Sequence, residues 1–555
     1  MAAIRLALLL LAATTLSALS EPSEGQILFL MQAGQAEKGV TTYLESVGEE
    51  HDVDLLRNMA YAVLEAGYGT QNPEEQLLAL FGASITGQAR VLPLLRNTLN
   101  SVHPEVQAAT VGLLAGLDHD EADELLLKAM SSPYPTTRLE ASLQLALKHH
   151  PDAPLHIESL MVKLPPQVHP LFPQLFAIVG NPEADRTLRR MLADPHPLME
   201  IATIDSLVKT GRDDFLPEIR SLARRTDPLL QEACAIAFGK LKDTSALPQL
   251  RPLMRSPNET VRIAALLSAH RLGEEGAKGE LERLALQENP YAITALGEVD
   301  GSQPTLASLL ASRDLTIRLN AAMALLQHKD ERATLALPDL LLTDGRDLGF
   351  MVQRTPSGAL PALKIVPSMH AHLKDFPPLE EMTLSLKEMA LEQVFALSEE
   401  TRLMVARGLF RHGEQPLIPH LVRLLENAKT PGALALLKLQ AETAGAPLIR
   451  TYCNLALFRA GEKGPYRERV TEWVERQQKI ALIQLKPPPS WEERLKSASP
   501  YTLAPEQTSR LLLESFEALA LKRDTTAINS ILEALARGNP HNRYALAGLL
   551  LRVLE

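Results

Sequence analysis

Residues 258–273 read NETVRIAALLSAHRLG, and this stretch predicts a helix that is apolar on one side. Asn258 is a favourable N-cap, because its side chain can accept a hydrogen bond from a free backbone N–H of the first turn. Apolar residues follow at the three-to-four-residue spacing of one helical face, and Gly273 can end the helix. The pattern also occurs at 227–241, DPLLQEACAIAFGKL, and at 196–211, HPLMEIATIDSLVKTG, so that successive copies begin at a constant interval.

Proline marks the period of this repeat. Positions at the same constant interval hold Pro73, Pro104, Pro135, Pro166, Pro197, Pro228, Glu259 and Pro290. Proline suits the first residue of a helix, where its missing N–H costs nothing and its fixed φ is already helical. Second helical stretches lie between these helices, and one such pair cannot bury its apolar faces alone. The predicted fold class is therefore all-α, an α-solenoid of stacked helix pairs with a period of about 31 residues, interrupted by one loop or hairpin insertion.

The period and its interruptions predict six segments. The spacing slips after Pro290, the stretch around Pro356-Ser357-Gly358 loses helical periodicity, and Lys486 is followed by three prolines. Glycine and proline clusters of this kind predict loops, hairpins or stiff connectors. The segments are a signal peptide (1–20), a repeat array (21–342), an irregular insertion loop (343–375), further helical pairs (376–485), a Pro-rich connector (486–504) and C-terminal helices with a terminal repeat-like helix (505–555).

The N-terminus predicts export. Arg5 precedes an apolar run over residues 6–19, and small residues occur before a cleavage site after Ser20. The alternatives are an uncleaved anchor or a buried first helix. The chain has two cysteines, Cys234 and Cys453, which is too few for a disulfide framework and suits a bacterial periplasm or envelope. No later stretch is apolar enough over a sufficient length to predict a transmembrane span.

Composition limits the class of partner. The chain has 555 residues, a hydrophobic content of 46% and a charged content of 22%, which is typical of a folded soluble protein. Its aromatic content of 4% favours helices over strands. Its formal net charge of −11 argues against nucleic acid, because acidic surfaces repel phosphate backbones. The oligomeric state stays open.

No motif for catalysis or metal binding stands out. The chain lacks a His-Glu-x-x-His motif, paired Cys-x-x-Cys motifs, a Gly-x-Ser-x-Gly elbow and a Walker loop. The nearest clusters, Asp118-His119-Asp120 and His370-Ala371-His372, are interpreted as solvated loops. We therefore expect no enzyme activity, no cofactor and no metal.

The repeat resembles a known family. The pattern N/D-x-x-V-R-x-x-A-A, with a partner helix around an L-P-x-L segment, resembles HEAT repeats of the short bacterial kind called PBS-lyase HEAT-like repeats. Residues 258–273 carry the pattern best, followed by 314–327 (DLTIRLNAAMALLQ) and 398–413 (SEETRLMVARGLFRHG). The resemblance covers residues 72–342 and, more loosely, 379–459. The resemblance implies a scaffold for protein–protein contact. Some proteins with these repeats resemble bilin lyases, but the predicted export argues against this enzyme class, because its chemistry is cytosolic.

Four arginines are the candidate partner-binding residues: Arg138, Arg262, Arg318 and Arg402. They follow the apolar anchor of the repeat, but the equivalent position is Gln107, His169, Glu200 and Gln231 in other copies. One interpretation is structural, with each arginine bonded to carbonyls and acids of a neighbouring repeat. The other places them on the concave surface, gripping an acidic partner.

The insertion has two interpretations as well, as a partner-contact element or as a tolerated loop. The predicted function is a non-enzymatic scaffold that binds a protein or peptide in the bacterial envelope. A structural protein associated with lipid or cell wall is the alternative.

Overall fold

The computed structural model describes residues 23–47, 50–87, 89–343, 348–367, 379–412, 415–483 and 507–554. The predicted signal peptide, the Pro-rich connector and the His370–His372 cluster lie outside the described residues. The rest is almost wholly helical, which confirms the predicted all-α solenoid, and its one sheet is a two-stranded hairpin in the described part.

The helix predicted from residues 258–273 is α17 (Glu259–Arg271). Its N-cap is confirmed, because the Asn258 side chain accepts hydrogen bonds from the backbone N–H of Thr260 at 3.1 Å and of Val261 at 3.2 Å. The predicted apolar face, which includes Val261 and Ala265, is buried.

Most of the proline positions begin a helix. Helices α5 (Pro73–Thr86), α7 (Pro104–Ala115), α9 (Pro135–Leu147), α13 (Pro197–Lys209), α15 (Pro228–Lys240) and α19 (Pro290–Leu296) start at the regularly spaced prolines. Pro166 instead begins a short 3-10 helix, η2 (Pro166–Leu171), which leads into α11 (Phe172–Val179). The side chain of the preceding Asn or Asp caps α5, α15 and α19 as the cap pattern predicts.

The chain folds into two compact units. Unit 1 combines Met1–Leu145 with Leu457–Glu555, and unit 2 is Ala146–Ala456. The boundaries therefore fall inside α9 and α27 (Pro447–Arg459), within stretches that the sequence assigns to continuous arrays.

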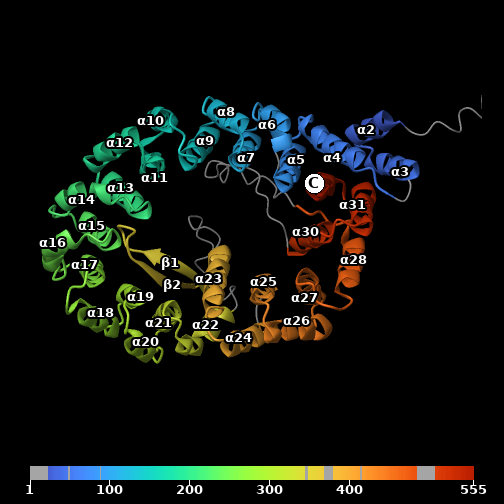
Figure 1. The fold of residues 1–555 in the computed structure, drawn as a ribbon. Helices are drawn as coiled ribbons and strands as arrows, with labels where there is room; N and C mark the ends of the chain where they lie inside the picture. The colour runs from blue at the N-terminus through green and yellow to red at the C-terminus, as the bar shows by residue number, and fades with distance from the viewer. Residues whose placement is uncertain are drawn as a thin grey trace, which may run out of the picture. The chain divides into compact units, whose positions relative to one another are not determined.

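Unit 2 carries its helices in two rows with a hairpin on the inner side (Figure 1). The inner row contains α11, α13, α15, α17, α19 and α21 (Leu315–Gln327). The outer row contains α10 (Ala153–Lys163), α12 (Pro182–Leu192), α14 (Leu216–Leu222), α16 (Leu247–Leu253), α18 (Ala277–Leu286) and α20 (Gln303–Leu309). The further helices are α22 (Leu337–Leu341), α23 (Leu379–Val394), α24 (Glu399–His412), α25 (Ile418–Ala428), α26 (Pro431–Thr443) and α27.

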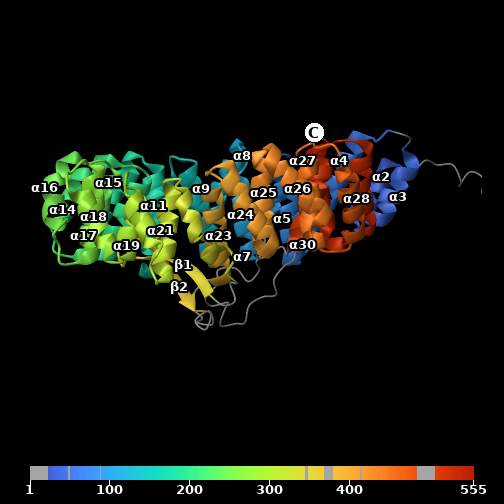
Figure 2. The same ribbon diagram turned by 90° about the horizontal axis from the view of Figure 1, so that it is seen from below.

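The described part of the predicted insertion is an antiparallel hairpin. Strand β1 (Leu348–Arg354) pairs with β2 (Pro361–Pro367), and Leu348 lies opposite Pro367. Strand β2 packs against α19 and α21, and β1 packs against α23. Figure 2 shows the hairpin at one edge of the helical rows of unit 2.

Unit 1 joins the two ends of the described chain. Its helices are α2 (Glu24–Gln32), α3 (Ala36–Ser46), α4 (Val53–Tyr68), α5, α6 (Leu92–Thr98), α7, α8 (Asp120–Ala129), α9, α28 (Tyr466–Gln477), α30 (Gln507–Ala520), α31 (Thr525–Arg537) and α32 (Arg543–Val553). The last helix, α32, packs against α4 and α5, while α31 packs against α3. The predicted terminal helix is present, and the Asn539 side chain accepts a hydrogen bond from the backbone N–H of His541 at 3.0 Å. Its packing on the N-terminal helices was not predicted.

Glycines allow α32 and α5 to approach at backbone distance. A Cβ atom placed on Gly548 would lie 2.8 Å from the carbonyl carbon and 3.1 Å from the Cα of Gly82, and closer still to the Gly82 oxygen. A Cβ atom on Gly82 would in turn meet the backbone of Tyr544 at 2.7 Å. Both helices therefore need a residue without a side chain where they cross. Residues Tyr544–Leu551 of α32 are all buried, so the last helix is part of the core of unit 1.

Candidate functional site

Three of the four candidate arginines close the turn that precedes their own helix. In each, a terminal guanidinium nitrogen donates a hydrogen bond to the backbone carbonyl six residues earlier. The pairs are Arg138 with Ser132 at 2.5 Å, Arg262 with Ser256 at 3.2 Å and Arg318 with Ser312 at 3.0 Å. Arg318 also forms an ion pair with Asp339 at 2.9 Å.

The fourth candidate, Arg402, lies in α24. Its Nε–H group, like those of Arg138 and Arg262, is buried without a hydrogen-bond partner among the described residues. The four arginines lie on four separate helices, α9, α17, α21 and α24, and the structure does not gather them into one cluster. A role of these residues in partner binding stays a prediction.

Several of the positions that lack arginine carry a donor for the same bond. The carbonyl six residues earlier accepts a hydrogen bond from the side-chain amide of Gln76 at 2.8 Å, Gln107 at 2.7 Å and Gln231 at 2.8 Å. His169 contacts the carbonyl of Leu164 at 3.0 Å. Arg450, which the sequence did not single out, bonds to the Ala444 carbonyl at 2.7 Å. This repeat position therefore selects a long side chain with an N–H group rather than arginine as such.

Two copies lack a side-chain donor at this position, Glu200, because a carboxylate cannot donate, and Ile293, which is apolar. The Oε1 atom of Glu200 accepts a hydrogen bond from Arg225, and its buried Oε2 atom has no partner in the described part of the chain. Burial raises the pKa of Glu200, and the nearby Arg225 guanidinium opposes this effect.

A second series of arginines joins outer helices to the following repeat. Arg189, Arg220 and Arg251 lie in α12, α14 and α16 and follow one another at the interval of the repeat. Each forms an ion pair with an acid of the following repeat: Glu218 at 3.0 Å, Asp243 at 2.7 Å and Glu274 at 2.9 Å. Their regular spacing was a signal in the sequence that could have identified this series.

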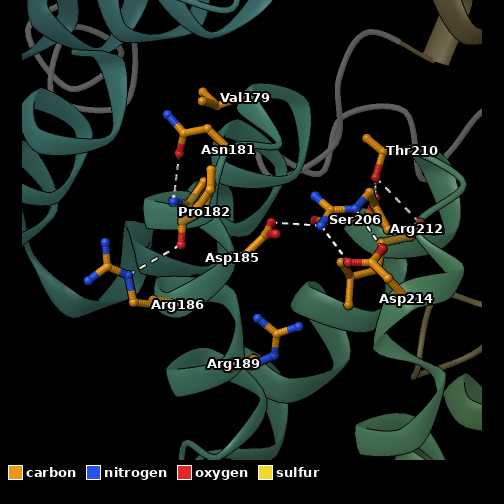
Figure 3. Close-up of polar contacts among 12 residues, drawn as sticks. Val179, Asn181, Pro182, Asp185, Arg186, Arg189, Ser206, Thr210, Arg212 and Asp214 are labelled. Atoms are coloured by element: carbon orange, nitrogen blue, oxygen red, sulfur yellow. Dashed lines mark hydrogen bonds and ion pairs between the residues drawn. The ribbon is translucent and has the colours of Figure 1, made fainter. Parts of the chain in front are cut away.

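Arg212 reinforces the same layer. Figure 3 shows its guanidinium between Asp185 of α12 and Asp214, with 2.7 Å hydrogen bonds to both carboxylates. The guanidinium also lies over the Phe215 ring, 4.9 Å from its centroid, and Arg189 lies 4.8 Å from that centroid. Hydrogen bonds from Arg212 lower the pKa of Asp214. These contacts link neighbouring repeats and give the outer layer a structural role.

The inner row of unit 2 binds the backbone of the hairpin. The Asn320 side chain on α21 donates to the Leu363 carbonyl at 2.9 Å and accepts from the Leu363 N–H at 2.8 Å. On the other edge of the hairpin, the Phe350 N–H donates to the Thr383 hydroxyl of α23 at 2.9 Å. Both strand edges are therefore held by helix side chains.

The hairpin turn is held by a buried acid. Glu232 on α15 is fully buried, and its Oε1 atom accepts hydrogen bonds from the hydroxyls of Thr355 and Ser357, the latter at 2.5 Å. Its Oε2 atom accepts a bond from the Thr260 hydroxyl of α17 at 2.6 Å. No periodic or motif signal pointed to Glu232 or Asn320, because both acquire their role only through contact with the hairpin.

The described residues hold no group of three or more His, Cys, Asp or Glu side chains placed to bind a metal ion. Both cysteines are buried, and burial raises the pKa of the Cys453 thiol to about 12 and that of Cys234 as well. His119 serves as a cap, accepting a bond from the backbone N–H of Glu121 at 3.2 Å. Within the described ranges, none of the helices has the length and apolar character of a membrane-crossing segment.

Comparisons with known proteins agree on the repeat. Residues 216–291 match the family model for HEAT repeats. No curated protein matches the chain. Among solved structures, the complex of CpcE and CpcF of phycocyanin lyase from Nostoc is similar, with 20% identity, 39% of this chain and 91% of that chain covered and a TM-score of 0.29. Kap121p is also similar, with 12% identity and a TM-score of 0.34. The match covers 94% of this chain and 79% of Kap121p.

The family match spans α14 to the start of α19, where the inner helices start at a constant interval. Capped helices and the turn bond recur on both sides of that stretch, in α5 and α7 before it and in α21 after it. The described chain is a helical solenoid, and residues 216–291 within it match HEAT repeats.

Proposed function

We propose that the chain is a non-enzymatic protein-binding scaffold of the bacterial envelope, and that the inner row of unit 2 holds its partner. Stacked repeats present extended surfaces that suit proteins and peptides better than small substrates. One observation carries the proposal. Asn320 on an inner helix bonds to both the N–H and the C=O of Leu363, so this surface holds a polypeptide backbone through a side chain.

The envelope location rests on the pattern of residues 1–20, with Arg5 before an apolar run and a small-residue cleavage site. Expression of the full chain in a Gram-negative host tests it. We expect the mature protein in the periplasmic fraction with a mass that corresponds to removal of residues 1–20. Retention of the complete chain in the cytoplasm would refute the location.

Site-specific photo-crosslinking tests the scaffold. A photoreactive phenylalanine analogue replaces Leu198 on inner helix α13, where the leucine is 60% exposed, and Leu286 on outer helix α18, where it is 57% exposed. We expect a discrete protein adduct from the inner position in the native host. The outer position is the matched control, because both sites are leucines of similar exposure. Equal labelling at the two sites, or adducts with lipid alone, would overturn the proposal in favour of a structural envelope role.

A further inference from the structure

One contact between the hairpin and the inner helices uses groups that any extended polypeptide carries. Asn320 is 2% exposed, and its amide is held in place by a hydrogen bond from the Thr294 hydroxyl at 3.1 Å. Its paired bonds to the N–H and C=O of Leu363 depend on backbone geometry and not on the side chain of the bound residue. This contact is therefore independent of sequence.

The contact at Glu232, by contrast, depends on which side-chain groups the bound segment carries. Its carboxyl group is fully buried and receives hydrogen bonds from three hydroxyl groups, those of Thr260, Thr355 and Ser357. Within the described ranges, no lysine, arginine or histidine forms an ion pair with it. The three hydroxyls are neutral donors, so none of them balances the negative charge that an ionised Glu232 carries. A lysine or arginine that reached Glu232 would add the attraction of opposite charges to the hydrogen bond, and a buried charge costs least when it is paired in this way.

We propose that the surface formed by α15, α17 and α21 around Glu232 and Asn320 is a binding site for an extended basic peptide, and that the hairpin is its built-in occupant. This inference rests on the proposed scaffold function and names the chemistry of the partner. The partner's backbone pairs with Asn320, and a lysine or arginine of the partner replaces Thr355 and Ser357 at Glu232. The tethered hairpin competes at an effective concentration of about millimolar, so it weakens partner binding until it is displaced.

The test uses two labelled synthetic peptides and two proteins. One peptide is the hairpin segment itself, residues 354–367 (RTPSGALPALKIVP), and the other carries Ser357→Lys. The proteins are the full chain and a variant in which a glycine–serine linker replaces residues 349–366. We expect both peptides to bind the hairpin-less variant, with the lysine peptide binding about tenfold more tightly. The full chain should bind each peptide at least about tenfold more weakly, because its own hairpin occupies the site.

A point variant assigns the preference to the acid. In the hairpin-less background, Glu232→Gln should abolish the advantage of the lysine peptide while leaving binding of the parent peptide within about twofold. Asn320→Leu, which removes the backbone bonds, should weaken both peptides alike. An unchanged lysine advantage in Glu232→Gln would overturn the assignment.

A second design covers a hairpin-less chain that fails to fold. The full-length double variant Thr355→Val with Ser357→Ala keeps the hairpin but removes both hydroxyl bonds to Glu232. Hydrogen exchange of the hairpin amides should become faster in this variant when the lysine peptide is added. If a folded variant binds neither peptide while the inner-helix crosslinks still form, the scaffold stands and this inference is wrong. If those crosslinks are also missing, the proposed function itself fails.

Discussion

Substitution of Gly548 by alanine tests the crossing of α32 and α5 in unit 1. The added methyl carbon would lie 2.8 Å from the carbonyl carbon of Gly82, and ordinary contact begins at 3.4 Å. The neighbouring atoms belong to the backbone, which cannot move aside as the end of a flexible side chain can. The Gly82 oxygen lies closer still, so the two helices would have to separate by more than about half an ångström, and overpacking of this kind costs about 1–3 kcal/mol.

The same substitution has an opposing helix-propensity effect that must be subtracted. Alanine in a helix interior is more stable than glycine by about 0.5–1 kcal/mol. Gly112 of α7 measures this effect alone, because a methyl group there meets no atom within 4 Å. We expect Gly112→Ala to raise the stability of unit 1 and Gly548→Ala to lower it by up to about 2 kcal/mol, the overpacking cost less the propensity gain.

Hydrogen exchange read out by mass spectrometry measures both variants, because it reports the opening free energy of α5 and α32 segment by segment. Urea unfolding followed by helical circular dichroism gives an independent midpoint. The sign of the effect decides the outcome. If Gly548→Ala slows exchange in α5 and α32 as Gly112→Ala does in α7, the two backbones are not in contact and the account of this crossing is wrong.

Four further predictions concern the repeats. Leu230→Asp buries an unpaired charge in α15, where the leucine is fully buried, and should lower the stability of unit 2 by at least about 2 kcal/mol in thermal or urea unfolding; an unchanged midpoint would refute the assignment of the apolar face. Arg262→Gln should keep the turn bond and change stability little, whereas Arg262→Ala should lose about 1 kcal/mol, and equal effects of the two would contradict the shared role of this repeat position. Cys234 and Cys453 should resist alkylation at pH 8 until the protein is unfolded, because burial disfavours the thiolate; rapid labelling of the native protein would show that they are accessible. The pKa of Asp214 is lowered in the folded protein, so its contribution to stability is complete above its unfolded pKa, near 4, and is lost as the pH falls through the lower folded value. Asp214→Asn should therefore show a smaller fall in unfolding midpoint than the parent protein between pH 5 and about pH 2.

The sequence predicted the features that repeat. Proline at the first helical residue and asparagine or aspartate before it act within a few residues, so the regular spacing of these residues is enough to locate the inner helices. Pro166 is the informative failure. It lies at the expected position but begins a 3-10 helix, with Pro170 inside that segment, and the α-helix starts only at Phe172.

The features that depend on distant contacts were beyond the sequence pattern. From its sequence context, Glu232 is predicted to be an ordinary surface acid of an amphipathic helix. In the structure it is a buried acceptor, because it bonds to Thr355 and Ser357 of the hairpin, which lies far later in the chain. The arginine position varies in residue identity, but Gln107 and Gln231 share with arginine the capacity to donate an N–H to the same carbonyl. The series of donors is interrupted at Glu200 and Ile293.

The packing of α32 on α4 and α5 has a consequence for synthesis of the chain. A ribosome makes the N-terminal helices of unit 1 first and their last partner at the end, with the whole of unit 2, Ala146–Ala456, in between. At about 5–20 residues per second, synthesis from the end of α5 at Thr86 to the start of α32 at Arg543 takes about 20 to 90 s. Until α32 is made, the apolar faces of α4 and α5 that it covers lack this partner, and exposed apolar surface of this kind makes an incomplete chain prone to aggregation.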